Sequence, residues 1–294
     1  MLRSASWLVA AVLVSAVAGT GRADFVLSGS EHLNVNLAHD IGILYDSSTA
    51  NVVSGGNVSL FDVNDEALLR VVSGEVHNLR LYDNSNVDIS GGDVGALSAY
   101  SNSSIHMSTG SIVWRLDAYD STSVDIFGGT IDLLYAWNEN PVAISGGTIR
   151  KASFRGNSTA EVSGGIFDNL DAIWDSTTTI SGGEFSAGVN MGSSGTMDIF
   201  GGSIPSLSAS DGIVTFHGYD FRGSGGLSLE DEWVVGTGWL TGKWSDGTAW
   251  ITRVDVNSGP WATIRLNVVP EPSTLAMLLC GLLAITCYWK RRRG

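Results

Sequence analysis

The sequence predicts an all-β protein: a parallel β-solenoid (β-helix) of about nine coils of 17–19 residues, with a small C-terminal β cap. Three observations predict this class. A glycine-containing corner recurs at a nearly constant interval, apolar residues keep the same register with it, and polar turns separate the apolar runs. One such repeat cannot bury its apolar face alone, whereas stacked copies share a continuous core. The alternatives are a stack of antiparallel hairpins and a propeller, although a propeller blade needs about 40 residues.

The corner is Ser-Gly-Gly or a close variant. Its middle residues are separated by 19, 17, 18, 19, 18, 18, 18 and 19 positions. Glycine suits a corner because, without a Cβ, it permits a positive φ or the close approach of another backbone. The corners centre on Gly55, Gly74, Gly91, Thr109, Gly128, Gly146, Gly164, Gly182 and Gly201.

Apolar residues alternate with polar ones on both sides of the corner, which is the period-two pattern of a half-buried strand. We expect the apolar positions to form one buried column, with each strand pairing to its counterpart about 4.8 Å away. Polar turns such as Asp83-Asn84-Ser85 fit between the strands, because their side chains bond nearby backbone. The positions two residues before each centre are Val53, Val72, Ile89, Met107, Ile126, Ile144, Val162, Ile180 and Ile199.

The ends of a solenoid need protection. Residues from Phe25 to about Val53 predict a first, irregular coil, so residues 24–212 are assigned to this cap and the repeats. Beyond them, Asp246-Gly247 between two alternating segments predicts a hairpin. Residues 213–268 are therefore expected to form the C-terminal β cap.

Residues 1–23 have the pattern of a secretory signal peptide: Arg3, a short apolar run, and small residues up to Ala23. Cleavage is expected after Ala23, with Ala18 as a second choice. The alternative is an uncleaved anchor, but the apolar run is shorter than the roughly 20 residues of a full span.

The C-terminal part combines three features in a fixed order: a proline-flanked acidic residue, an apolar segment and a basic tip. The segment Leu275–Trp289 predicts a short transmembrane helix, and a basic tip stays cytoplasmic, so the body would lie beyond the inner membrane. A permanent anchor is the alternative to a transient one. The motif is Val269, Pro270, Glu271 and Pro272, and the tip is Lys290, Arg291, Arg292 and Arg293.

This order resembles the PEP-CTERM sorting signal of exosortase substrates over residues 269–294. The resemblance implies recognition through Pro270, Glu271 and Pro272 by an exosortase in the membrane. It also implies a Gram-negative host that makes exopolysaccharide, which is a further expected partner. The segment before the signal is similar to that of planctomycete-like PEP-CTERM proteins. A sorting signal leaves the function of the body open.

The charge and the cysteine content restrict the functions that are possible for residues 24–268. Only Glu271 of the 30 acidic residues and six of the 16 basic ones lie outside this range, which leaves 29 and 10 and a formal charge near −19. This charge argues against nucleic acid as a ligand, since binding to phosphates needs Lys and Arg. Cys280 and Cys287 both lie in the apolar segment, so the body has neither a disulfide nor a thiolate metal site.

The sequence predicts no catalytic residue, metal site or cofactor. Glycoside hydrolysis needs two carboxylates across one bond, whereas the Asp residues between 117 and 132 occupy turn and outward strand positions of a solvated face. Three basic residues close together in the sequence are interpreted as part of a surface that keeps the protein soluble. The five histidines lack the spacing of metal ligands. These residues are Asp117, Asp120, Asp125, Asp132; Arg150, Lys151, Arg155; and His32, His39, His77, His106, His217.

Five tryptophans crowd the C-terminal cap: Trp233, Trp239, Trp244, Trp250 and Trp261. We interpret them as the core of the cap, and a weak glycan-binding site is the alternative. The sequence thus predicts an exported, non-enzymatic cell-surface or extracellular matrix protein, processed by exosortase. The alternatives are a polysaccharide lyase or glycoside hydrolase of the β-helix type, and a glycan- or cell-binding adhesin.

Overall fold

The computed structural model describes residues 24–256 and 262–271. The expected signal peptide with Ala23, Pro272, the expected transmembrane segment and the basic tip lie outside the described residues. The described residues form strands and turns, without a helix. They fall into two compact units, Met1–Ile149 and Arg150–Gly294.

Both units contain parallel β-coils, which confirms the predicted solenoid. Counted over the two units, the described residues form about 11 turns, more than the nine expected. The count of Ser-Gly-Gly corners was too low because turns without that motif also adopt the fold. The segment expected as an irregular first coil is regular: Phe25–Leu27 pairs in parallel register with Gly42–Leu44.

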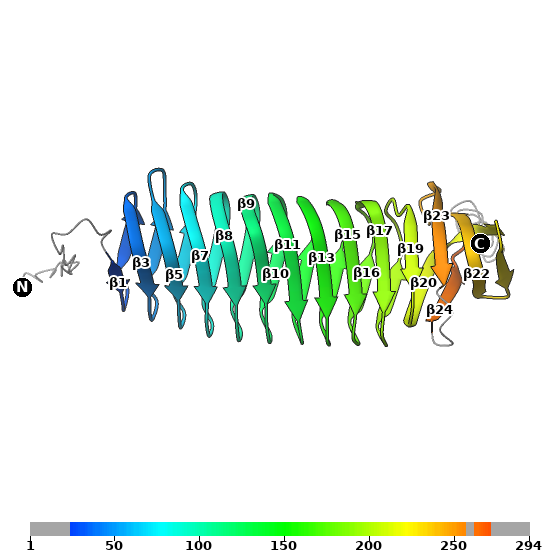
Figure 1. Ribbon diagram of the computed structural model, residues 1–294, viewed down its shortest axis with the longest axis horizontal. Helices are drawn as coiled ribbons and strands as arrows, with labels where there is room; N and C mark the ends of the chain where they lie inside the picture. Colours follow the sequence, from blue (N-terminus) through cyan, green and yellow to red (C-terminus); the bar gives the residue numbers. More distant parts are fainter. Residues whose placement is uncertain (1–23, 257–261, 272–294) are drawn as a thin grey trace, which may run out of the picture. The chain divides into compact units, whose positions relative to one another are not determined.

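Each coil of the first unit contains two strands, and each strand pairs in parallel with its counterpart in the next coil (Figure 1). We call the sheet made of the first strands the ladder sheet. Its strands are β1 (Phe25–Leu27), β3 (Ala38–Leu44), β5 (Asn57–Val63), β7 (Glu75–Leu81), the ends of β8 (Asn86–Ala99) and β9 (Ser104–Ala118), and β11 (Thr130–Trp137). The second strands are β2 (His32–Val35), β4 (Thr49–Val52), β6 (Leu68–Val71), the starts of β8 and β9, β10 (Ser123–Ile126) and β12 (Pro141–Ile144).

The second unit repeats this plan. Within it, β15 pairs with β17 and β17 with β19, while β14, β16, β18 and the start of β20 pair in that order, all in parallel. The strands are β13 (Thr148–Arg155), β14 (Thr159–Val162), β15 (Ile166–Ile173), β16 (Thr177–Ile180), β17 (Glu184–Gly192), β18 (Thr196–Ile199), β19 (Ser206–Ala209) and β20 (Gly212–Ser224).

An antiparallel module follows the last coil. It contains the end of β20, β21 (Leu227–Glu230), β22 (Trp233–Lys243), β23 (Ala249–Val256) and β24 (Ala262–Val268). The hairpin predicted at Asp246-Gly247 is confirmed, since Lys243 of β22 faces Ala249 of β23. Strands β23 and β24 also pair in parallel with β19 and β20, so the module covers the edge of the last coil.

The core lies between the strands of each coil, where the predicted apolar column is buried. Val58, Phe61 and Val63 of β5 are fully buried, and so is Leu97 of β8. Val72 is an exception, with 46% of its surface exposed. The pairing explains this, because Val71 and not Val72 faces Ile89 of the next coil. Our alignment of this corner was therefore wrong by one residue, and so was that of Val53, which is half-exposed beside the buried Val52.

The corner glycines allow neighbouring coils to approach closely. A Cβ added to Gly91 would lie 2.0 Å from the carbonyl oxygen of Val72, and one added to Gly182 would lie 2.3 Å from that of Ser163. Side chains do not fit at such distances, so these positions require glycine regardless of their φ.

A second turn joins the two strands of each coil and recurs with a similar sequence. In Tyr82-Asp83-Asn84-Ser85, the Tyr82 amide donates to the Ser85 Oγ over 3.1 Å, and Asp83 has a φ of 57°. Ser85 is fully buried, and Thr122 is buried in the equivalent turn. The hydrogen bond within this turn fixes the backbone position of its first residue, which on several coils is aromatic.

Candidate functional site

Four aromatic residues at this turn form a stack along the ladder sheet. The ring centroids of Tyr82 and Tyr100 are 5.4 Å apart, those of Tyr100 and Tyr119 are 5.0 Å apart, and those of Tyr119 and Trp137 are 6.2 Å apart. The planes of successive rings are inclined by 11° or less. Because strands of successive coils are about 4.8 Å apart, a ring on each coil stacks on the next one. We call these four residues the aromatic ladder.

The sequence contains a signal for the aromatic ladder that we did not use. Each ring follows directly after an inward residue, such as Ala99 before Tyr100 or Ala136 before Trp137. A recurring aromatic residue at the first outward position after a strand would have indicated a stacked column. The rings are half-buried, so their edges reach the surface of the ladder sheet.

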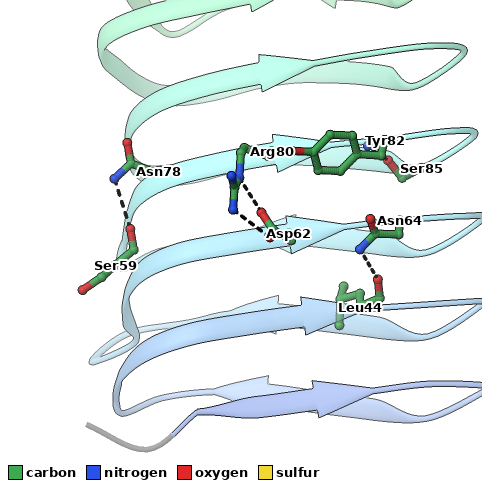
Figure 2. A network of polar contacts seen from close by, with 8 residues as sticks. All are labelled: Leu44, Ser59, Asp62, Asn64, Asn78, Arg80, Tyr82 and Ser85. Carbon is green, nitrogen blue, oxygen red and sulfur yellow. Dashed lines mark hydrogen bonds and ion pairs between the residues drawn. The ribbon is translucent and has the colours of Figure 1, made fainter. Parts of the chain in front are cut away.

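A polar column runs beside the aromatic ladder on the same face. Register places Asp62, Arg80, Ser98, Asp117 and Tyr135 at equivalent positions of successive coils. At its start, Arg80 donates from Nε to Asp62 Oδ1 over 2.7 Å and from its terminal nitrogen to Oδ2 over 2.8 Å (Figure 2). The hydrogen bond to Asp62 raises the pKa of Arg80, so the guanidinium of Arg80 stays protonated.

Figure 2 also shows how the ladder and the column meet. The ring of Tyr82 lies along its strand with its hydroxyl directed toward Arg80, which in turn points to Asp62 on the neighbouring coil. Asn78, farther along the same strand, donates to the carbonyl oxygen of Ser59 over 3.3 Å. The face is therefore organised across coils, and not only along each strand.

Asp117 is the most unusual residue of the polar column. We expected its side chain on a solvated face, but only 4% of that side chain is exposed. Arg115 forms a salt bridge with it and is itself 54% exposed. Burial raises the pKa of Asp117, while the charge and hydrogen bond of Arg115 act in the opposite direction. Burial also raises the pKa of the neighbouring Tyr119, and the charge of Asp117 adds to that shift.

An exposed tryptophan, Trp114, precedes this buried carboxylate by three residues. Val94 faces Ile112 and Ala96 faces Arg115, so Gly95 alone lies opposite Val113 and Trp114. This is a β-bulge, which adds one residue to a strand and redirects side chains. Trp114 is 56% exposed as a result. The bulge, Arg115, Asp117 and the aromatic ladder together form the candidate binding surface.

The two carboxylates of the polar column are not placed like the catalytic pair of a glycoside hydrolase. The next carboxylate along the polar column is Asp62, three coils from Asp117. Three strand spacings amount to about 14 Å, whereas the two catalytic carboxylates of such enzymes are at most about 9.5 Å apart. Among the described residues, no group of three or more His, Cys, Asp or Glu side chains could hold a metal ion.

Lys151 and Arg155, two of the basic residues that we expected on a soluble surface, contact neighbouring side chains in the second unit. Lys151 Nζ lies 2.6 Å from Asp171 Oδ2, and the guanidinium of Arg155 lies 5.6 Å from the ring centroid of Trp174. Asn190 also donates to Asp171 over 2.7 Å. These contacts form a polar network of the second unit, while Arg150 is exposed.

The tryptophans of the C-terminal module divide into two groups. Trp244 is 5% exposed and stacks on Trp250, with ring centroids 4.6 Å apart, and Trp250 stacks on Phe216 of the last coil. Trp233 and Trp239 are 41% and 45% exposed. The interpretation as core is therefore correct for the first pair and wrong for the second, while Trp261 lies outside the described residues.

The residues predicted to begin a sorting motif follow β24 directly. The Val269 amide donates to the Gly218 carbonyl over 2.8 Å, and Pro270 and Glu271 are exposed. Just before it, Asn267 lies 2.9 Å from Nδ1 of His217, whose Nε2 lies 2.8 Å from Asp198 Oδ1. The strand is thus held to the last coil up to the residue before the first proline.

The fold and these surfaces define the class: a parallel β-solenoid protein with an antiparallel C-terminal module and a repeated polar and aromatic face. No protein-family model, curated protein or solved structure matches the chain. In the part of the chain that the structure describes, no helix is long and apolar enough to cross a membrane.

Proposed function

We propose that this chain is an exported, non-enzymatic protein of the cell surface or extracellular matrix, which an exosortase recognises and processes at its C-terminus. The order of Val269-Pro270-Glu271-Pro272, an apolar segment and a basic tip carries the proposal. The position of the motif supports it. Since Pro270 has no amide hydrogen, it cannot extend the pairing of β24, and the exposed Pro270 and Glu271 are accessible to a membrane enzyme.

The solenoid suits a location outside the cell. Its stability comes from stacked coils and a buried apolar column rather than from disulfides, so it is independent of the redox state of the compartment. The charge of about −19 on residues 24–268 favours solubility after export.

The proposal is tested by following the native protein in host strains with and without the exosortase. We expect the protein of the wild-type strain to end near residue 271 and to reach the surface or the medium. In the strain without exosortase, the apolar segment would be retained and the protein would remain in the membrane fraction. Mass spectrometry of the C-terminal peptide measures both outcomes.

A matched pair of variants separates the motif from the anchor. Replacing Pro270, Glu271 and Pro272 by Ala is expected to block processing, whereas Ser273→Ala leaves it unchanged. Identical processing of both variants and of wild type would contradict the role of the motif.

Polysaccharide cleavage is the alternative function. Asp62 and Asp117, the two carboxylates of the polar column, are too far apart to act together as the catalytic pair of such an enzyme. Release of reducing ends or unsaturated uronates from a panel of polysaccharides by the purified chain would overturn this part of the proposal.

A further inference from the structure

The aromatic ladder presents one ring edge per coil, at intervals of 5.0–6.2 Å. Successive rings cover each other's faces, so between Tyr82 and Trp137 the ladder offers tyrosine hydroxyl groups and ring edges in a row rather than separate flat platforms. A ligand that matches this row must itself repeat at a similar interval. A linear polysaccharide does so, because the length of one pyranose unit in an extended chain is close to the strand spacing.

The charged residues of the polar column are each paired with a residue of opposite charge on the same face. Asp62 is bound by Arg80 through two hydrogen bonds, and Asp117 is bound by Arg115. Such pairs offer hydrogen-bonding groups in a fixed geometry with little net charge. A chain of strongly negative total charge repels a polyanion, whereas a face of paired charges accepts hydroxyl groups of an uncharged sugar.

The bulge adds an exposed apolar ring to this face. Trp114 lies on the outer side of β9, and Tyr119 lies five residues later, in the turn that follows β9. Asp117 of the polar column comes between them, so the polar column lies between Trp114 and the aromatic ladder. Between Arg80 and Asp117, the intervening coil carries only the small outward residues Gly95, Ala96 and Ser98. Trp114 supplies a ring face for stacking, which the ladder does not.

We propose that the face formed by the aromatic ladder, Arg80, Arg115 and Trp114 binds a linear, uncharged polysaccharide that runs along the direction of coil stacking. Trp114 stacks on a sugar ring, while the two arginines and the tyrosine hydroxyls hydrogen-bond to hydroxyl groups of successive units. The biological role of this site rests on the proposed function, because only an exported protein meets such a polymer.

The test uses the full purified chain in detergent and affinity electrophoresis in gels that contain soluble β-glucan, xyloglucan or polygalacturonate. We expect retardation by at least one of the uncharged polymers and none by polygalacturonate. Trp114→Ala should weaken binding about five- to tenfold. A triple variant with Phe at positions 82, 100 and 119 keeps the stacked rings but removes the hydroxyls, and it should also weaken binding.

Trp239→Ala is the matched control, because Trp239 is similarly exposed but belongs to the C-terminal module. Its binding should equal that of wild type. Absence of retardation by both uncharged polymers, preference for polygalacturonate, or equal losses in the Trp114 and Trp239 variants would overturn the inference. These assays do not depend on sorting, so a failure here is distinct from a failure of processing in the host.

Discussion

Tyr100 contacts a ring on each side, Tyr82 at 5.4 Å and Tyr119 at 5.0 Å between centroids. Aromatic pairs contribute about 0.5–1.5 kcal/mol each beyond the area they bury. We therefore expect Tyr100→Ala to lower the free energy of unfolding by about 2 kcal/mol or more, measured by urea denaturation. Tyr100→Phe keeps both contacts and should remain within about 0.5 kcal/mol of wild type. Equal stability of the two variants would show that the stack contributes nothing.

Asp117 gives a prediction on pH dependence. Burial raises its pKa in the folded state, so the folded protein binds this proton more tightly than the unfolded chain does. The contribution of Asp117 to stability is therefore greatest below its ordinary pKa and falls as the pH rises through the raised value. The Asp117→Asn variant has no carboxyl group at this position, so it does not lose stability at position 117 as the pH rises.

The difference in melting temperature, Asp117→Asn minus wild type, should consequently increase as the pH rises through that window. Thermal unfolding followed by circular dichroism from pH 3 upward measures it, and the other carboxylates cancel because both proteins contain them. A difference that is constant or decreases with pH would contradict the assignment of Asp117 as a buried carboxylate.

Gly91 tests the close approach of neighbouring coils. An added Cβ would lie 2.0 Å from the Val72 oxygen, so Gly91→Ala must displace a coil and should cost about 3 kcal/mol or more. At Gly29 nothing lies within 4 Å of an added Cβ, and its φ is +64°. Gly29→Ala should therefore cost only the backbone strain, about 1 kcal/mol. Thermal unfolding of both variants compares them, and an equal loss of stability would show that close approach is not the reason for glycine at position 91.

The C-terminal module offers a comparison of a buried with an exposed tryptophan. Trp244 is buried against Trp250, so Trp244→Ala should cost about 3–5 kcal/mol. Trp239→Ala should change stability by no more than about 1 kcal/mol, because its ring is 45% exposed. Thermal unfolding monitored by near-ultraviolet circular dichroism measures both. If both variants melt like wild type, the stack on Phe216 does not hold the module to the last coil.

The sequence was most informative where the physical constraint repeats. Buried positions such as Ile89, Leu97 and Ala99 recur because every coil adds to the same column, and the corner glycines recur because neighbouring backbones touch. The hairpin at Asp246-Gly247 was predictable because its turn chemistry is local.

The surface was less predictable because its chemistry depends on which coils are neighbours. Asp117 is outward in its strand and therefore seemed solvated, but it lies between Ser98 and Tyr135 of the neighbouring coils and only 4% of its side chain is exposed. Likewise, the exposure of Val72 follows from a shift of one residue at one corner, which an alignment on glycine alone does not detect.

The bulge at Trp114 shows that the outside of a coil can gain a residue while the inside keeps its register. Ile112 and Leu116 still face Val94 and Leu97 of the preceding coil, although one more residue lies between them. Because the buried pairing is unchanged by such an insertion, the outer residues of one coil can change without disturbing the core that it shares with its neighbours. Proteins of this kind can diverge in what they recognise while their scaffold stays the same.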